Sequence, residues 1–260
     1  MSKINSLINR SESFFAEIGE MAYFAGRFFS ELFSRPFEFR ELLRQCYNMG
    51  NRSLFLVVVT GFILGLVFTL QSRPTLIEFG AVSWMPSMIS ISIVREIGPV
   101  MIALICAGKI GSGIGAELGS MKVTEQIDAM EVSGTNPFKY LVVTRIMAVT
   151  LMLPLLVIVG DTVALVGSAL VENLKGGVSY TLYFNLAFKS LSFGDVIPAT
   201  VKTVLFGFAI GLVGTYKGYN CGKGTVGVGD ASNSAVVYSS MLLFIIDFIA
   251  VFVSDIFFEI

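Results

Sequence analysis

The sequence has 260 residues, of which 54% are hydrophobic and 14% are charged, whereas ordinary soluble domains have about 45–50% and about 25%. A soluble domain of this length could not bury so much apolar surface, so the composition predicts a membrane protein. The formal net charge of -1 excludes a broadly basic surface for nucleic acid.

The residue types present indicate neither a catalytic site nor a metal site. The chain contains no histidine, which is the commonest general base and metal ligand in proteins. Its three cysteines, Cys46, Cys106 and Cys221, are far apart and have no CxxC spacing. We therefore expect no catalytic residues, no metal site and no disulfide framework.

Residues 1–50 have the pattern of an amphipathic helical region that precedes the membrane spans. Phe14, Ile18 and Met21 recur at intervals of four and three residues, whereas Glu17 and Glu20 fall on the opposite side. Such a pattern is typical of a helix that lies in the membrane interface. A cytoplasmic helix packed on its own domain is the weaker alternative, because no other soluble segment is evident.

The remaining residues, 51–260, form a single predicted membrane domain. A spanning helix needs about 20 mostly apolar residues. Five stretches meet that requirement, and the fold class is therefore an all-α polytopic membrane protein with an interfacial helix before the first span. The predicted spans cover about 53–72, 85–115, 146–171, 196–216 and 234–254.

The distribution of basic residues predicts the orientation of these spans. Cytoplasmic segments retain an excess of lysine and arginine. With the N-terminus in the cytoplasm, most of the 18 basic residues fall on the cytoplasmic side, and the reverse orientation inverts that ratio. Five spans then place the C-terminus on the opposite side.

Charged residues inside the predicted spans are candidates for function, because each one costs several kcal/mol in a bilayer. Arg95 and Glu96 are adjacent in the second span, and both an ion pair and a ligand contact remain open for them. Asp161 lies in the third span and Asp247 in the fifth. We interpret these two acids as hydrogen-bonded structural groups, with proton relay as the alternative.

A glycine-rich stretch at 107–120 does not fit a nucleotide-binding loop. A P-loop requires Gly-Lys followed by Ser or Thr after a strand, and here Ile110 follows Lys109. ATP-driven work would therefore need another subunit, and this chain should hold no cofactor itself. The glycines instead form a small-residue row that favours close helix packing, at Gly111, Gly115 and Gly119.

The segment at about 120–139, between the second and third spans, contains a predicted short helix. Thr124 is expected at its start, followed by acidic residues in the first turns. Ile127 and Met130 are expected to project an apolar edge. This segment is either a solvated connector or a docking element for a cytoplasmic partner.

Several long motifs resemble the MlaE permease family, the membrane subunits of ABC transporters that act with MCE proteins in lipid trafficking. The resemblance covers about 45–252. The motifs that carry it are REIGP at 95–99, AGKIGSGIGAELGSM at 107–121, TEQIDAM at 124–130, LPLLVIVGD at 153–161 and SNSAVVYSSMLLFIIDF at 232–248.

The resemblance implies a homodimer in the bacterial inner membrane, with two cytoplasmic ATPase subunits that bind ATP and magnesium. It also implies a periplasmic MCE hexamer as partner, phospholipid as substrate, and a role in outer-membrane lipid asymmetry. The N-terminal helix then corresponds to the elbow helix of such permeases. The docking element for the ATPase would comprise Thr124, Glu125, Ile127, Asp128 and Met130.

The resemblance further implies a lipid cavity between two protomers. Arg95 and Lys202 are expected to hold a lipid phosphate by charge-assisted hydrogen bonds. The alternative function is a stand-alone, proton-coupled carrier of a hydrophobic substrate, which would use carboxylates within the spans. The residues expected in the cavity are Gln71, Arg95, Glu96 and Lys202 as polar groups and Leu66, Val67 and Leu70 as apolar wall.

Overall fold

The computed structural model describes residues 2–34 and 37–258, and all regular secondary structure in that part of the chain is helical. Five helical segments are long and apolar enough to cross a membrane, which confirms the predicted fold class. They cover Phe39–Glu78, Val82–Val123, Phe138–Gly176, Phe193–Tyr219 and Gly224–Ile256.

The helix that contains the first predicted span starts before that span. Helix α1 (Ser2–Leu32) ends well before residue 50, and helix α2 (Phe39–Glu78) runs without interruption through the predicted boundary. The buried face of α2 begins with Leu42 and continues through Met49 and Val57. Because this face is continuous, residues 39–50 of the predicted N-terminal region belong to the same helix as the first span.

The second span is built from several short helices joined end to end. After the 3₁₀ turn η1 (Val82–Trp84), α3, α4 and α5 are separated by two π-helical turns. Such turns insert a residue into the helical repeat and often occur at functional positions. Their bounds are α3 Met85–Ser92, η2 Ile93–Ile97, α4 Gly98–Cys106, η3 Ala107–Gly111 and α5 Ser112–Val123.

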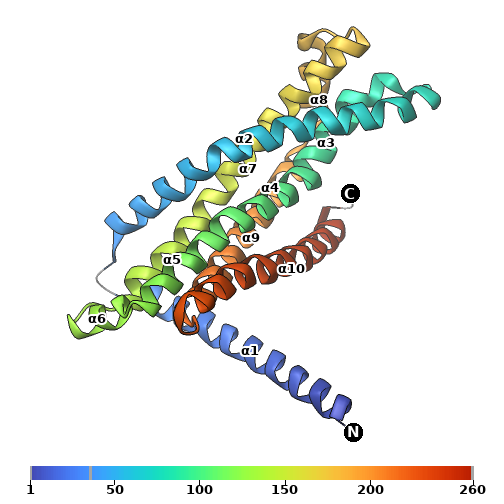
Figure 1. Cartoon of the computed structure of the whole chain (residues 1–260). Coiled ribbons are helices and arrows are strands. Elements are labelled where there is room, and N and C mark those ends of the chain that lie inside the picture. The colour runs from blue at the N-terminus through green and yellow to red at the C-terminus, as the bar shows by residue number, and fades with distance from the viewer. Residues whose placement is uncertain (1, 35–36, 259–260) are drawn as a thin grey trace.

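The remaining helices complete an inclined bundle (Figure 1). Helices α1 and α6 lie at one end of it, whereas α8 and the end of α2 lie at the other. Helix α8 lies in a connection for which the sequence had suggested no helix. The bounds are α6 Gln126–Val132, η4 Phe138–Val143, α7 Thr144–Gly176, α8 Tyr180–Ser190, α9 Phe193–Tyr219 and α10 Gly224–Phe258.

Helices α2 and α7 touch along their backbones. A Cβ atom added at Gly61 would lie 2.6 Å from the Gly160 carbonyl oxygen, and one added at Gly65 would lie 1.8 Å from that of Ala164. Only glycine permits so close an approach. This contact fixes the first span against the third.

Helix α1 packs its apolar face under the starts of η4 and α7 and the end of α9. Phe24 lies edge-on to Phe138, with ring centroids 4.9 Å apart. Glu17 and Glu20 were expected on the opposite side, but both bind the bundle, because Tyr216 Oη donates to Glu20 over 2.9 Å and Lys217 donates to Glu17. Aromatic side chains are exposed on α1 at Tyr23 and Phe29 and directly after it at Phe33, which suits a membrane interface.

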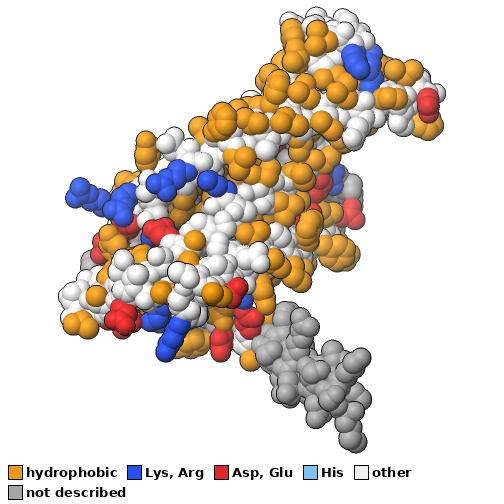
Figure 2. Space-filling model, in the orientation of Figure 1, with side chains coloured by type: hydrophobic (Ala, Val, Ile, Leu, Met, Phe, Trp, Pro, Cys, Tyr) orange, Lys and Arg blue, Asp and Glu red, His pale blue; other side chains and the backbone are white. Residues whose placement is uncertain are grey.

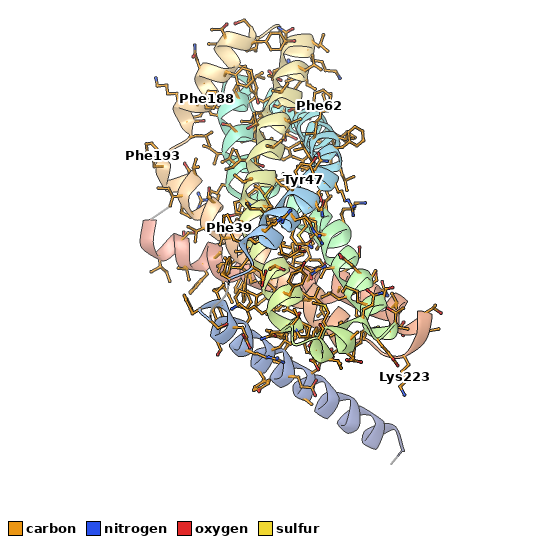
Figure 3. The ribbon with its side chains drawn as sticks, turned by 90° about the vertical axis from the view of Figure 1, so that its left-hand side faces the viewer. Phe39, Tyr47, Phe62, Phe188, Phe193 and Lys223 are labelled. Atoms are coloured by element: carbon orange, nitrogen blue, oxygen red, sulfur yellow. The ribbon has the colours of Figure 1, made fainter. Side chains whose placement is uncertain are left out.

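Exposed aromatic residues also occur near the opposite end of the bundle. Phe188 of α8 is 63% exposed and Phe193 of α9 is 85% exposed, and both lie at the outer edge in Figure 3. Phe79 and Trp84 are similarly exposed between the first and second spans. Aromatic side chains at both ends are typical of a protein that spans a bilayer.

Candidate functional site

A buried lysine holds three helices together within the spans. Lys202 of α9 is 4% exposed, and its Nζ lies 2.5 Å from Glu96 Oε2 and 3.0 Å from Asp247 Oδ1. Glu96 belongs to the π turn of the second span, and Asp247 belongs to α10. Because a buried charge is costly without partners, these two carboxylates compensate the burial of the Lys202 ammonium group.

Arg95 points to a different partner. Its guanidinium lies 3.9 Å from Asp195 Oδ1. The other oxygen of Asp195 accepts hydrogen bonds from the backbone N–H and the hydroxyl of Ser192, at 3.0 and 2.7 Å, and so caps the start of α9. Asp195 was absent from the predicted site, although the Ser-x-x-Asp spacing was visible in the sequence.

These charged residues leave little space among themselves. Arg95, Glu96, Asp195 and Lys202 line a pocket of about 20 Å³, beside the end of α10. That volume holds about one water molecule. The expectation that Lys202 binds a lipid phosphate is therefore not met within one chain, since its charge is already taken by two carboxylates.

Asp161 of α7 lies against the point where the second span changes from π to α geometry. A Cβ atom added at Gly98 would lie 1.8 Å from Asp161 Oδ1. This oxygen is buried and has no hydrogen-bond partner in the described part of the chain. The expected interpretation of Asp161 as a satisfied structural acid is therefore wrong for that oxygen, whereas Asp247 is satisfied by Lys202.

An apolar groove of about 470 Å³ lies between α2 and α4. Val67 and Gln71 line it from α2, and Ile97 and Met101 line it from the second span. Leu66 and Leu70 are not among its lining residues, because they lie on an adjacent face of α2. Gln71 is exposed at its edge.

The groove and the charged pocket are two separate features of one chain. Glu96 lines the pocket, whereas its neighbour Ile97 lines the groove. The expected cavity residues are therefore divided between two surfaces that share the second span. Polar and apolar recognition do not converge on a single closed site within one copy.

The connector helix α6 differs from its predicted form. It begins at Gln126 rather than at Thr124, because the Thr124 hydroxyl donates to the Ser120 carbonyl over 2.8 Å and so ends α5. Glu125 between the two helices has a left-handed backbone, with φ of 59°. Thr124 also accepts a hydrogen bond from Gln126 Nε2, at 3.0 Å.

The apolar edge of α6 faces inward. Ile127 is 1% exposed and belongs to the main core, with Met130 packed against it. The prediction that Ile127 projects towards a partner is therefore wrong, whereas Met130 is half-buried. The exposed surface of this helix includes Asp128, Glu131 and Val132, and Glu125 directly before the helix is exposed as well. Lys122 Nζ lies 2.8 Å from Asp128 Oδ1.

The glycine row of η3 and α5 packs against α9 and the α10 region. A Cβ atom added at Gly115 would lie 3.1 Å from the Ala231 carbonyl oxygen, and one at Gly119 would lie 3.2 Å from Cys221 Sγ. Gly111 is closest to Ile210. These residues pack helices, as their spacing suggested.

A buried arginine anchors the same region, although its position between the predicted second and third spans suggested only a cytoplasmic charge. Arg145 is 2% exposed, and its guanidinium donates to Glu117 Oε1 over 2.7 Å and to the Leu141 carbonyl over 3.0 Å. It joins the start of α7 to α5. No periodicity marks such a residue, because its partner lies 28 residues away.

Comparison with known proteins gives consistent results. The family model described as Permease MlaE matches residues 42–253. A probable ABC transporter permease protein of Rickettsia typhi is 38% identical over 247 residues, which cover 95% of each chain. One of Synechocystis is 32% identical over 87% of this chain and 86% of its own. The chloroplastic protein TRIGALACTOSYLDIACYLGLYCEROL 1 of Arabidopsis thaliana is 32% identical over 86% of this chain and 64% of its own.

Proposed function

This chain belongs to the MlaE family of ABC transporter permeases, and we propose that it moves phospholipid between the inner membrane and a periplasmic MCE protein. The observation that carries the proposal is the apolar groove between α2 and α4, which has room for part of an acyl chain and a polar group, Gln71, at its edge. A relative is named after trigalactosyldiacylglycerol, which is a lipid. In a cell with two membranes, such transport maintains outer-membrane lipid asymmetry.

ATP hydrolysis by partner subunits supplies the energy for this transport. Removing a lipid from a bilayer is uphill by about 0.8 kcal/mol for each CH₂ group that loses its apolar surroundings. Helix α6 exposes Asp128 and Glu131 to solvent at the end of the bundle, and Glu125 directly before it adds a third acid to this acidic surface of α6. We assign this acidic surface as the docking site for the ATPase, in place of the apolar edge that the sequence had suggested.

The working unit is a homodimer, with the lipid between the two copies. The groove and the charged pocket both open at the surface of one chain, so a second copy would enclose them. Helix α10 supports a further contact with the second copy, because only 11% of its most apolar stretch is buried within the chain. In this assembly an MCE hexamer contacts the α8 end, on the periplasmic side with the C-terminus.

The basic residues support a cytoplasmic N-terminus. The end of the bundle that carries α6 and the α9–α10 connection contains Lys122 and Lys223, and the start of α2 adds Arg40, Arg44 and Arg52. An excess of basic residues marks the cytoplasmic side.

A proton-coupled carrier is less well supported. Its candidate carboxylates included Glu96 and Asp247, and both are bound to Lys202. The third candidate, Asp161, has a buried oxygen without a hydrogen-bond partner in the described residues. Because two of the candidate carboxylates form ion pairs with Lys202, they favour a fixed structural cluster over a path for protons.

Transport by the purified chain, with and without its ATPase, tests the proposal. Reconstituted vesicles containing a fluorescent phospholipid should transfer that lipid to an acceptor only when ATP and the ATPase are present. Mass spectrometry of the purified complex should find phospholipid bound. ATP-independent transfer by the chain alone would instead support the carrier.

A further inference from the structure

A second, larger pocket lies outside both features described above. It has a volume of about 590 Å³ and lies between the start of α2 and α5. Asn48 and Arg52 line it from α2, and Lys109, Gly113 and Glu117 line it from the second span. It contains several polar and charged groups, unlike the groove between α2 and α4.

Two cations of this pocket have no ion pair among the side chains that the structure describes. Arg44 is held by Glu41, whose Oε2 lies 3.1 Å from Arg44 Nε, whereas neither Arg52 nor Lys109 lies within ion-pairing distance of a described acid. The acid of the pocket, Glu117, is bound to Arg145. Figure 2 shows basic side chains gathered over this end of α2. The pocket therefore has an excess of positive charge that suits an anion.

The position of Arg52 sets the depth of this pocket. Arg52 is the last charged residue before the charge-free run at 53–72. A charge that directly precedes an apolar span lies at the level of the lipid headgroups. At that depth in a membrane, the anionic groups next to the pocket are those of lipid headgroups.

An apolar stripe continues from the pocket along the same face of α2. Leu56, Val59 and Ile63 follow Arg52 at intervals of four, three and four residues, and each is exposed. Ile63 also lines the groove between α2 and α4. At a rise of about 1.5 Å per residue, Ile63 lies about 16 Å along the helix from Arg52. This distance is close to half of the thickness of the hydrocarbon core, which is about 30 Å. The acyl chains of a lipid in one leaflet have a similar length.

We propose that the pocket between α2 and α5 binds the phosphate headgroup of an anionic phospholipid, with Arg52 and Lys109 as its cations and the acyl chains along α2. The lipid belongs to the leaflet on the α6 side. Basic pockets between spanning helices recognise such headgroups. The proposal requires only that the chain spans the membrane, so binding of the lipid can be tested without measuring transport.

Gly113 provides the space for the headgroup. It lies one helical turn from both Lys109 and Glu117, and a Cβ atom added there would meet nothing within 4 Å. A large side chain at this position should fill the pocket without changing its charge. Gly113→Phe therefore tests the site independently of Arg52 and Lys109.

Native mass spectrometry of the purified complex in phosphatidylethanolamine nanodiscs, titrated with phosphatidylglycerol, tests the proposal. Arg52→Gln with Lys109→Gln should weaken phosphatidylglycerol binding about thirty-fold, the loss expected for two cations beside an anionic headgroup. Gly113→Phe should weaken it comparably. The matched control, Arg40→Gln with Lys223→Gln, removes two exposed charges outside the pocket and should change binding less than twofold.

Three results would overturn the proposal. Unchanged phosphatidylglycerol binding in both the double variant and Gly113→Phe would exclude the pocket as a lipid site. Displacement of the lipid by an equal concentration of inorganic phosphate would make it a site for free anions. A disulfide between two copies through Asn48→Cys would make it a dimer contact. Retained lipid transfer with lost phosphatidylglycerol binding would support the site, because transport and binding are then separate.

Discussion

Lys202 and Glu96 form an ion pair across 106 residues of sequence, with 2.5 Å between Nζ and Oε2, and so connect α9 to the π turn of the second span. Asp247 completes the cluster from α10. Since an ion within a bilayer needs compensation, the three groups depend on one another. The cluster thus fixes the relative positions of three spans.

Removal of Lys202 alone should be strongly destabilising. Lys202→Met leaves two carboxylates without their cation, and loss of one partner of a buried pair costs about 3–5 kcal/mol. Thermal unfolding of the detergent-purified protein should show a lower midpoint. Adding Glu96→Gln and Asp247→Asn to Lys202→Met should recover most of the loss. A midpoint unchanged by the single substitution would show that the cluster does not stabilise the fold.

Gly65 should tolerate no side chain, because α2 meets α7 there. The Cβ atom of Gly65→Ala would lie 1.8 Å from the Ala164 carbonyl oxygen, so the helices must separate. Overpacking of this kind costs about 1–3 kcal/mol. Gly108→Ala is the matched control, since a Cβ atom there meets nothing within 4 Å. Equal unfolding midpoints for the two variants would contradict the described contact.

The acidic surface of α6 should determine ATPase binding. Glu125→Lys with Asp128→Lys reverses two exposed charges, and the ATPase subunit should no longer co-purify with the permease. Glu78→Lys with Asp255→Lys makes the same change in charge at exposed positions outside α6 and should leave co-purification intact. Full recovery of the ATPase with the α6 variant would rule out this docking surface.

Ile127 should act through stability rather than through a partner. Because it is 1% exposed, Ile127→Ala should cost about 2–5 kcal/mol and lower the unfolding midpoint of the isolated chain. Val132 on the same helix is 91% exposed, so Val132→Ala should leave that midpoint unchanged. If Ile127→Ala reduced only ATPase binding, the inward orientation of α6 would be wrong.

The spans could be predicted from the sequence because the bilayer demands long apolar helices, which composition alone reveals. The side-chain pairs between helices could not be predicted, since they depend on which helix faces meet. Glu96 and Lys202 were both selected as polar residues, but their pairing removes the free cation that a phosphate would need. The burial of Arg145 could not be predicted either, because it depends on the contact of α7 with α5.

The start of α6 illustrates a second limit. A threonine between two helices can cap the second helix or end the first, and local sequence does not distinguish these outcomes. Here Thr124 binds Ser120, and Glu125 takes the left-handed turn that directs Ile127 inward. The predicted apolar edge failed because the direction of α6 depends on that turn.

Tyr183 gives a pH-dependent test of how α8 is attached. Its hydroxyl donates to Ser168 Oγ over 2.6 Å, and Thr69 of α2 donates to the same oxygen over 2.7 Å. Burial raises the pKa of Tyr183 to about 12 from an ordinary value of 10.0. The unfolded chain therefore loses this proton at lower pH than the folded chain, so stability falls as pH rises from 10 towards 12.

Tyr183→Phe should remove that dependence. The variant loses a hydrogen bond worth about 0.5–1.5 kcal/mol, so its unfolding midpoint should be lower at pH 8. Between pH 10 and 12 its midpoint should decline less steeply than that of the unmodified chain, because phenylalanine has no proton to lose. Tyr180→Phe, at a 47% exposed position of the same helix, serves as the control and should retain the steeper decline. Parallel declines for Tyr183→Phe and the unmodified chain would mean that Tyr183 does not anchor α8 through a protonated hydroxyl.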